Sequence, residues 1–346
     1  MRDNIKRLVP YSSARHEFEG RARVFLDANE STLVSRFGTG LNRYPDPQQK
    51  EIKRRLGRIL EIDGSQIFVG NGSDEAIDLL FRVFCRPGRD NVVICPPTYG
   101  VYEVAADVND IAVRRVNLTD SFDLDLKAIR SAINDTTKLI FLCSPNNPTG
   151  NLVNRDAIID ILDFFAGIVV VDEAYIHFAN ERSLASEIDS FPNLVVLQTF
   201  SKAWGLAGLR VGFAIANRSI TDLLCKTKPP YNVSNLAQEI VLDALRHPAL
   251  MEHCVERTIA ERNFLAQELT NFPFVTKVFP SDANFLLVRM TDAAKVHAFL
   301  LGDGIVVRNR SDAVGCESCL RITVGTSEEN RALLYALSRY ETSPIY

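Results

Sequence analysis

The stretch GIVVVDEAY at residues 167–175 decides the fold that we expect for this chain of 346 residues. Its apolar run does not alternate with polar residues, which is typical of a strand buried on both faces of a mostly parallel sheet. Comparable runs lie at residues 66–70, 91–95, 138–143, 193–200 and 209–216, with helical patterns between several of them. Strands that alternate with helices predict a layered α/β domain.

The pattern changes after about Leu245, where we predict a second, smaller unit. A long helical pattern is followed by short strand-like pieces and by a final helical pattern, an order that is typical of an α+β domain. We therefore expect an N-terminal arm at residues 1–21 and a large α/β domain at residues 48–245. The small domain is expected to combine residues 22–47 with residues 246–346.

Composition and charge limit the kinds of partner. The 39 lysines and arginines are outnumbered by 43 aspartates and glutamates, and a net charge of -4 argues against a nucleic-acid partner. No apolar run approaches the roughly 18 residues that span a bilayer, and the basic N-terminus lacks the apolar segment of a secretory signal. We therefore expect a cytoplasmic protein with neither a membrane nor a nucleic-acid partner.

The seven cysteines are odd in number and stand mostly in apolar stretches, which favours reduced thiols. Cys316 and Cys319 form a C-x-x-C spacing, for which a zinc or redox role stays open. Because no second pair and no histidine motif accompanies them, a structural role is favoured. We predict no metal site.

Chemically active residues follow the predicted strands. In open α/β sheets, ligands bind at the carboxyl ends of the strands. The sequence places a glycine-rich turn after residues 66–70, an amide-rich loop after 138–143, acidic and phenolic groups after 167–171, and a lysine after 193–200. These side chains are therefore expected to meet along one edge of the sheet.

Each of these segments alone allows several interpretations. The turn at residues 70–72 can offer N–H groups to a phosphate or be a plain turn, and Glu75 breaks the G-x-G-x-x-G dinucleotide pattern. Asp172 can cap a helix, bind a metal or pair with a charge. Lys202, which follows a buried strand, can have a lowered pKa and form a Schiff base with a carbonyl.

Together these segments specify pyridoxal 5'-phosphate. The cofactor needs an amine for its aldehyde and a group that moves protons, both supplied by Lys202, and a carboxylate opposite its ring nitrogen, supplied by Asp172. Tyr175, which we count with these two as catalytic, and Asn147 are assigned to the ring hydroxyl, and Tyr99 to the ring face. The residues assigned to the phosphate are Gly72, Ser73, Asp74, Ser201 and Arg210.

Three motifs in this order, SPNNPTG (144–150), VVDEAY (170–175) and TFSKAWGLAGLRVG (199–212), resemble the fold-type-I pyridoxal-phosphate aminotransferases. That resemblance implies a large α/β/α domain with a mostly parallel central sheet and a smaller α+β domain. A closer resemblance, to the histidinol-phosphate aminotransferases, is carried by NRYPDP, VGNGSDEAIDLL, CPPTYGVY and LRITVGTSEEN, and runs from about Leu8 to Asn330.

The closer resemblance implies a substrate and a partner. The reaction would be transamination of L-histidinol phosphate with 2-oxoglutarate, giving imidazole-acetol phosphate and L-glutamate in histidine biosynthesis. Tyr11, Arg308 and Arg321 match residues that hold the substrate phosphate, and Asn147 is also expected to contact the substrate. Tyr44 matches a residue that reaches the cofactor phosphate of a second subunit, which implies a homodimer with composite active sites.

Other functions stay open at this point. An aromatic aminotransferase or a threonine-phosphate decarboxylase can use the same scaffold, because arginine forks suit several anions. An NAD-dependent oxidoreductase would explain the alternation of strands and helices. The missing third glycine and the position of Lys202 argue against that last class.

Overall fold

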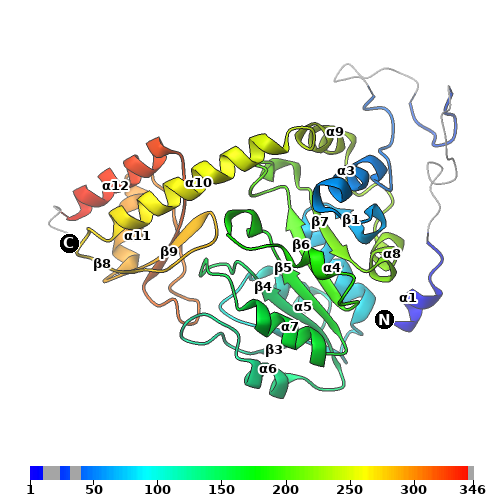
Figure 1. Cartoon of the computed structure of the whole chain (residues 1–346), viewed down its shortest axis with the longest axis horizontal. Coiled ribbons are helices and arrows are strands. Elements are labelled where there is room, and N and C mark those ends of the chain that lie inside the picture. Colours follow the sequence, from blue (N-terminus) through cyan, green and yellow to red (C-terminus); the bar gives the residue numbers. More distant parts are fainter. Residues whose placement is uncertain (11–23, 32–39, 342–346) are drawn as a thin grey trace.

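The computed structural model describes residues 1–10, 24–31 and 40–341 (Figure 1). In this part of the chain, helices and strands form two sheet-containing parts that are joined by one long helix (Figure 1). No helix within the described residues is long and apolar enough to cross a membrane. Tyr11 lies outside the described residues.

The larger sheet has seven strands in the spatial order β1-β7-β6-β5-β4-β2-β3. β7 runs antiparallel to both of its neighbours, and the other adjacent strands are parallel. The predicted mostly parallel α/β sheet is therefore confirmed. β3 was not anticipated, because it is a partly exposed edge strand without an apolar run. The bounds are β1 Ile67–Gly70, β2 Asn91–Ile94, β3 Ala112–Arg115, β4 Thr137–Cys143, β5 Ile168–Asp172, β6 Leu194–Thr199 and β7 Gly212–Ala216.

Helices cover both faces of this sheet. Along β5, Val169 and Val171 belong to one core cluster and Val170 belongs to the opposite one, which explains why the strand is apolar at every position. One face carries α3 (Lys50–Leu60), α6 (Leu126–Ala132), α7 (Arg155–Phe164) and α9 (Asn235–Ala244), and the other carries α4 (Ser73–Phe84), α5 (Val101–Val108) and α8 (Arg218–Thr227). A short helix, α1 (Asp3–Arg7), and four 3₁₀ turns, η1 (Gly64–Gln66), η2 (Ile176–Phe178), η3 (Leu184–Glu187) and η4 (Ala207–Leu209), complete this part.

The smaller sheet is antiparallel and has the order β10-β11-β9-β8. Its apolar cluster includes Leu286 and Val288 of β9 together with Leu333 and Leu337 of α12. The predicted division of the chain into domains stays a prediction. The bounds are α10 Pro248–Leu269, β8 Val275–Val278, β9 Phe285–Met290, α11 Ala293–Gly302, β10 Arg308–Asn309, β11 Cys319–Thr323 and α12 Ser327–Glu341.

The two sheets are held together beside a shared apolar cluster. Tyr175 and Phe178 from the large sheet pack with Val255 of α10 and Phe285 of β9. Arg262 of α10 is buried and donates hydrogen bonds to the carbonyls of Phe178 (3.2 Å) and Ala283 (2.8 Å). This junction fixes β11 and β10 opposite the carboxyl ends of β4, β5 and β6.

Candidate active site

One cavity collects most of the residues singled out from the sequence. It has a volume of about 530 Å³ and lies at the carboxyl ends of the parallel strands, opposite β10 and β11. Neither sheet alone forms it. The sequence-predicted residues that line it are Ser73, Asp74, Tyr99, Asn147, Asp172, Tyr175, Ser201, Lys202, Arg210, Arg308 and Arg321.

Lys202 stands in a tight turn just beyond the end of β6. The turn is closed by a hydrogen bond from the Gly205 N–H to the Lys202 carbonyl (3.0 Å). The Nζ atom lies 5.4 Å from the centroid of the Tyr175 ring. Burial, followed by the positive charge of Arg321, lowers the pKa of the Lys202 ammonium. A lowered pKa makes the neutral amine more available as a nucleophile or a base.

Asp172 ends β5 as a buried carboxylate, 3% exposed. Its Oδ2 accepts a hydrogen bond from the Tyr102 hydroxyl (2.7 Å), and its Oδ1 accepts one from the Ala174 N–H (3.1 Å). Burial raises the pKa of this carboxyl to about 6, although both hydrogen bonds oppose the rise. A cationic group in the cavity would restore the ionised form, since an opposite charge favours the carboxylate.

Tyr102 was not singled out from the sequence. It is fully buried in α5, stacks on Phe141 at 4.9 Å and meets the edge of Tyr99 at 5.5 Å. A buried tyrosine hydroxyl needs a partner, and here that partner is Asp172. The available signal was its place three residues after Tyr99, which lies just before α5.

The start of α4 forms an anion cradle. Gly72 has φ 78° and caps the helix without a side-chain hydrogen bond, so the first N–H groups of α4 keep their donor capacity. Arg210 adopts φ 54°, and its Nη1 donates to Ser201 Oγ (3.2 Å) while its Nη2 lies 3.3 Å from Asp74 Oδ2. Left-handed backbone in a residue other than glycine costs roughly 1 kcal/mol or more and is concentrated at functional sites.

β7 approaches this cradle very closely. A Cβ atom added to Gly212 would lie 2.3 Å from the Ser73 backbone nitrogen, and one added to Gly72 would lie 2.9 Å from Arg210 Nη2. Because these two glycines lack a Cβ atom, space stays open between β7, the N-terminus of α4 and the Arg210 guanidinium. Gly72, although predicted as a site residue, is not among the residues that line the cavity.

Asn147 connects the two sheets across the cavity. Its Oδ1 accepts a hydrogen bond from Arg321 Nη1 at 2.5 Å, and its Nδ2 donates to the Tyr175 hydroxyl at 3.5 Å. Burial raises the pKa of the Tyr175 hydroxyl above its ordinary value, so this group stays protonated and able to donate. One amide thus orients a phenol and a guanidinium at the same time.

Three guanidinium groups line the side of the cavity that belongs to the small sheet. Arg308 pairs with Arg321 across the antiparallel β10–β11 ladder, and Arg310, just beyond the end of β10, lines the same cavity. No ion pair joins any of the three to a carboxylate within the described residues. Arg310 was not singled out, although alternation along the sequence RNR was a signal for it.

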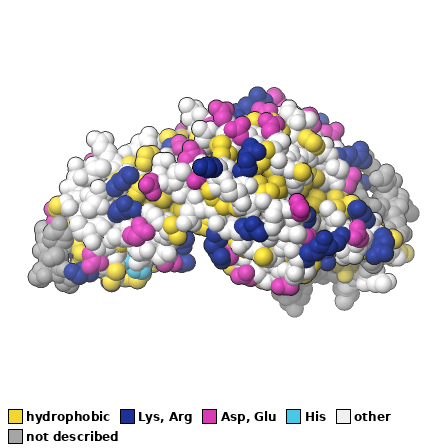
Figure 2. Space-filling model, turned by 90° about the horizontal axis from the view of Figure 1, so that it is seen from below, with side chains coloured by type: hydrophobic (Ala, Val, Ile, Leu, Met, Phe, Trp, Pro, Cys, Tyr) yellow, Lys and Arg dark blue, Asp and Glu magenta, His cyan; other side chains and the backbone are white. Residues whose placement is uncertain are grey.

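The outer surface is electrically mixed. Figure 2 shows basic and acidic side chains interspersed on one face of the molecule. Inside the cavity, by contrast, three arginines stand together without an ion pair to a carboxylate in the described part of the chain.

Tyr44 does not line the Lys202 cavity of its own chain. It is 50% exposed, stacks on Tyr231 at 4.4 Å and faces an adjacent cavity of about 470 Å³ that also touches Arg210. The role predicted for it, contact with the cofactor of a second subunit, stays a prediction. Tyr11 stays one as well, because it lies outside the described residues.

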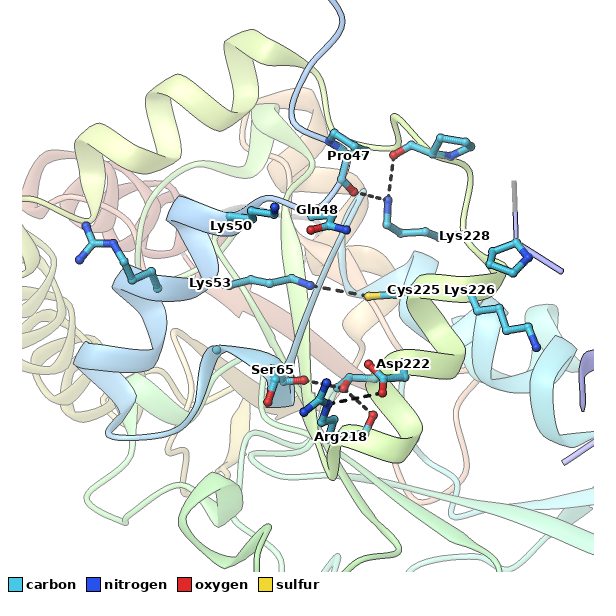
Figure 3. Close-up of a pocket in the computed structure, with 15 residues that line it drawn as sticks. Pro47, Gln48, Lys50, Lys53, Ser65, Arg218, Asp222, Cys225, Lys226 and Lys228 are labelled. Carbon is cyan, nitrogen blue, oxygen red and sulfur yellow. Dashed lines mark hydrogen bonds and ion pairs between the residues drawn. The ribbon is translucent and has the colours of Figure 1, made fainter. Parts of the chain in front are cut away.

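A larger cavity, of about 890 Å³, lies away from these residues between α3 and α8 (Figure 3). It holds none of the predicted site residues. The catalytic groups thus occupy a smaller cavity, and its chemistry, not its size, identifies the candidate active site.

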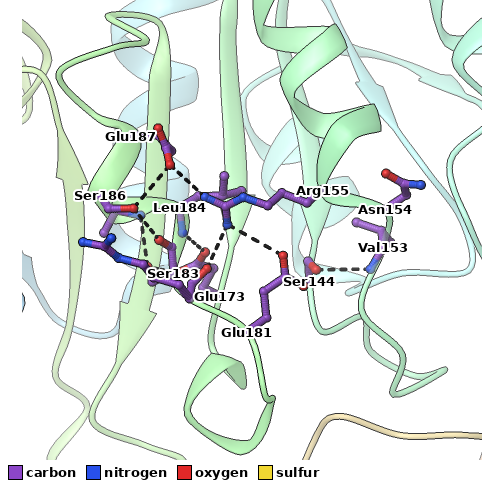
Figure 4. A network of polar contacts seen from close by, with 12 residues as sticks. Ser144, Val153, Asn154, Arg155, Glu173, Glu181, Ser183, Leu184, Ser186 and Glu187 are labelled. Carbon is purple, nitrogen blue, oxygen red and sulfur yellow. Dashed lines mark hydrogen bonds and ion pairs between the residues drawn. The ribbon is translucent and has the colours of Figure 1, made fainter.

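Glu173 follows Asp172 in the chain but belongs to a separate polar network (Figure 4). It accepts hydrogen bonds from the Ser183 hydroxyl, the Leu184 N–H (2.7 Å) and Gln198 Nε2 (3.0 Å). Burial raises the pKa of its carboxyl to about 7. Two adjacent buried carboxylates therefore have different tasks: Asp172 faces the cavity, and Glu173 ties β5, β6 and the start of η3 together.

The seven cysteines are all unpaired, and Cys316 and Cys319 are buried. Both pack with Phe122, Phe279 and Leu287. Burial raises the pKa of the Cys316 thiol to about 12 and that of the Cys319 thiol above its ordinary value. Among the described residues, no group of three histidine, cysteine or acidic side chains could hold a metal ion.

Residues 21–337 match the family model described as aminotransferase class I and II. The histidinol-phosphate aminotransferase of Cytophaga hutchinsonii is 49% identical over 340 residues, which cover 98% of this chain and 98% of that one. Among solved structures, the histidinol-phosphate aminotransferase from Clostridium acetobutylicum has a TM-score of 0.81 at 26% identity, covering 87% of this chain and 91% of that one. The L-threonine-O-3-phosphate decarboxylase from Porphyromonas gingivalis has a TM-score of 0.76 at 27% identity, covering 88% and 92%.

Proposed function

This chain belongs to the aminotransferase class I and II family, and on that premise we propose that it transfers the amino group of L-histidinol phosphate to 2-oxoglutarate. The products are imidazole-acetol phosphate and L-glutamate, and the reaction is a step of histidine biosynthesis. The Cytophaga hutchinsonii relative, which is similar over nearly its whole length, supports this choice of substrate.

Enzymes of this family use pyridoxal 5'-phosphate, and the residues around Lys202 fit that cofactor. The buried Asp172 carboxylate suits a protonated ring nitrogen, and the α4 N-terminus with Arg210 suits a phosphate. The space kept open by Gly72 and Gly212 at this cradle supports the fit. When bound, the cofactor supplies an aldehyde that condenses with amines and a ring that withdraws electrons from the substrate carbon.

We assign proton transfer to Lys202 Nζ. Its lowered pKa allows the amine to accept a proton from the substrate carbon and to return one. Asp172, oriented by Tyr102 and Ala174, would supply the negative charge that keeps the ring nitrogen protonated. Tyr175 stays protonated, so its hydroxyl keeps a proton to donate to the cofactor, while it accepts a hydrogen bond from Asn147 Nδ2.

The three arginines of β10 and β11 are the observation that carries the substrate assignment. A phosphate ester has close to two negative charges near neutral pH, and guanidinium forks bind it with charge-assisted hydrogen bonds. Arg308, Arg310 and Arg321 offer such forks without a competing carboxylate among the described residues. Arg321 also suits the α-carboxylate of glutamate in the second half-reaction.

We propose that the enzyme works as a homodimer in the cytoplasm. The half-exposed Tyr44, stacked on Tyr231 beside Arg210, supports contact with the cofactor phosphate of a second subunit. The unpaired cysteines support a reducing compartment. If sites are composite, mixing inactive Lys202→Ala with inactive Tyr44→Ala restores activity, because one site of the mixed dimer keeps both groups. Failure of this complementation in a mixed dimer would contradict composite sites.

A substrate panel tests the proposed function. We expect kcat/KM for histidinol phosphate to exceed that for phenylalanine and tyrosine by about 100-fold, since several hydrogen bonds to charged groups are lost without the phosphate. A preference for the free aromatic amino acids would contradict the proposal.

The same panel includes threonine phosphate, because the decarboxylase from Porphyromonas gingivalis is a structural neighbour of similar identity. Release of carbon dioxide from threonine phosphate, faster than amino transfer from histidinol phosphate, would replace the aminotransferase assignment with a decarboxylase.

A further inference from the structure

The cavity between α3 and α8 has an excess of positive charge (Figure 3). Its volume is about 890 Å³, and it shares no lining residue with the Lys202 cavity. The whole chain carries a net charge of -4, so this excess is local. Among the described residues, Asp222 is the one carboxylate on the wall, against the six cations Lys50, Lys53, Lys226, Lys228, Arg54 and Arg218.

Both arginines of this cavity already have carboxylate partners. Arg54 binds Glu51 at 2.5 Å, and Arg218 lies 3.6 Å from Asp222. Within the described residues, no ion pair joins Lys53, Lys226 or Lys228 to a carboxylate. The charges of these three ammonium groups are therefore not offset by a carboxylate in ion-pair contact within this part of the chain, and Lys53 and Lys226 have the fewest acceptors.

The present contacts of these ammonium groups are neutral. Lys53 Nζ donates to the thiol of Cys225 at 3.6 Å, and sulfur is a weak acceptor. Lys226 Nζ donates to the carbonyl of Lys6 at 3.2 Å. Lys228 Nζ donates to the carbonyls of Pro47 (2.7 Å), Pro229 (3.2 Å) and Pro230 (2.9 Å) and to Asn232 Oδ1 (2.9 Å), so its three N–H donors are already used. In Figure 3, Lys53 and Lys228 reach toward the same space from opposite sides.

The three lysines come from two helices, α3 and α8, so the packing of these helices sets how close their charges lie. Lys53 lies on α3, Lys226 on α8 and Lys228 at the C-terminal end of α8. Burial lowers the pKa of the Lys228 ammonium to about 8, and the charge of Lys53 contributes to this lowering. An anion placed between these groups would be attracted by all three.

We propose that this cavity binds a compound that carries a diphosphate group, the group shared by inorganic pyrophosphate and nucleoside diphosphates. Two phosphate groups carry roughly three negative charges at neutral pH, which suit a wall where, among the described residues, six cations stand against one carboxylate. The volume lies in the range of small-molecule sites, roughly 300–1,000 Å³, and exceeds what one phosphate fills.

The test is calorimetric titration of the cofactor-loaded enzyme with pyrophosphate, ADP and orthophosphate. Wild type is expected to bind pyrophosphate and ADP at least tenfold more tightly than orthophosphate. The double variant Lys53→Glu, Lys226→Glu is expected to weaken both by about 30-fold or more, because attraction becomes repulsion. Lys127→Glu, which makes the same charge change at an exposed position of α6, leaves both affinities unchanged.

The outcomes separate this cavity from the active site. The double variant is expected to keep transamination within twofold of wild type. If the double variant does not fold, the milder Lys53→Gln is measured in its place. We expect Lys53→Gln to weaken the binding of pyrophosphate and ADP about tenfold. Equal affinities for pyrophosphate and ADP would mean that the cavity recognises the diphosphate group alone. Tighter binding of ADP would mean that the cavity also contacts the nucleoside. Either of these two results supports the proposal. Absence of binding, or binding lost in Arg308→Met, Arg321→Met but kept in the double variant, overturns it.

Discussion

The two ends of the Lys202 cavity offer anions different kinds of site. At the end on the large sheet, the backbone N–H groups of α4 stand beside one guanidinium, and β7 presses against them at Gly212. At the end on the small sheet, three arginine side chains extend from the two-residue strand β10, the residue after it and the neighbouring strand β11. Anion binding at the first end therefore depends on the fixed shape of the backbone, and anion binding at the second end depends on the positive charge of the side chains.

This difference has a physical basis. Backbone donors at a strand–helix turn are held by the hydrogen-bonded ladders of β1, β7 and β6, so they cannot follow a ligand of another shape. Arginine side chains have several rotatable bonds and can follow different anions. A cofactor that stays bound suits the rigid end, and substrates that alternate between a phosphate and a carboxylate suit the adjustable end.

Removing the amine between the two ends has the largest expected effect. Lys202→Ala should lower kcat by on the order of 10⁴-fold, because both the nucleophile and the proton carrier are lost. Borohydride treatment followed by mass measurement should then find no cofactor attached to the chain. Lys127→Ala serves as the control. Near-normal turnover in Lys202→Ala would contradict the assignment of the site.

Closing the rigid end should have the next largest effect. The Cβ atom of Gly212→Ala would lie 2.3 Å from the Ser73 nitrogen. We expect the dissociation constant of the cofactor to rise about 10- to 100-fold, since overpacking costs about 1–3 kcal/mol. Gly208→Ala is the matched control, because nothing lies within 4 Å of its added Cβ atom. Equal cofactor affinity in both variants would show that the cradle is not rigid.

The adjustable end should tolerate loss of one group. Arg310→Met should raise KM for histidinol phosphate about tenfold through loss of charge-assisted contacts, with kcat and KM for glutamate within twofold of wild type. Arg321→Met should raise KM for both substrates. Steady-state kinetics with each substrate measures the split. A parallel rise of both KM values in Arg310→Met would mean that Arg310 acts only through Arg321.

A smaller effect is expected at the Asp172 carboxyl, between the two ends. Its pKa, raised to about 6 by burial, is held down in part by the Tyr102 hydroxyl. Tyr102→Phe should raise this pKa further, so the acidic limb of the kcat/KM profile moves to higher pH by about one unit. The exposed Tyr335→Phe is the control. A shift toward lower pH would contradict the role of Tyr102.

Much of the large sheet could be predicted from the sequence, because unbroken apolar runs mark strands buried on both faces. β3 could not, because an exposed edge strand needs no such run. On α3, Ile52 and Leu56 are buried and Leu60 packs against the core, whereas Ile59, at the margin of the same helix face, is 39% exposed. Local spacing therefore predicts the centre of a buried face better than its margins.

The candidate site shows the same division. Residues at strand ends, such as Asp172 and Lys202, could be found because the ends of parallel strands meet at one edge. Arg310 and Tyr102 were not found, because each acquires its place from a partner on another element. Glu173, adjacent to Asp172, turned out to belong to a different network for the same reason.

By itself, the sequence determined the α/β class, the order of the buried strands and the kinds of chemical group at their ends. These follow from periodicity and turn residues, which act over a few positions. Only the tertiary structure decided that Asn147 binds Arg321, 174 residues away, that Tyr102 holds Asp172, and that lysines of α3 and α8 share a cavity. Such contacts depend on how whole helices and sheets pack, and no local pattern encodes that packing.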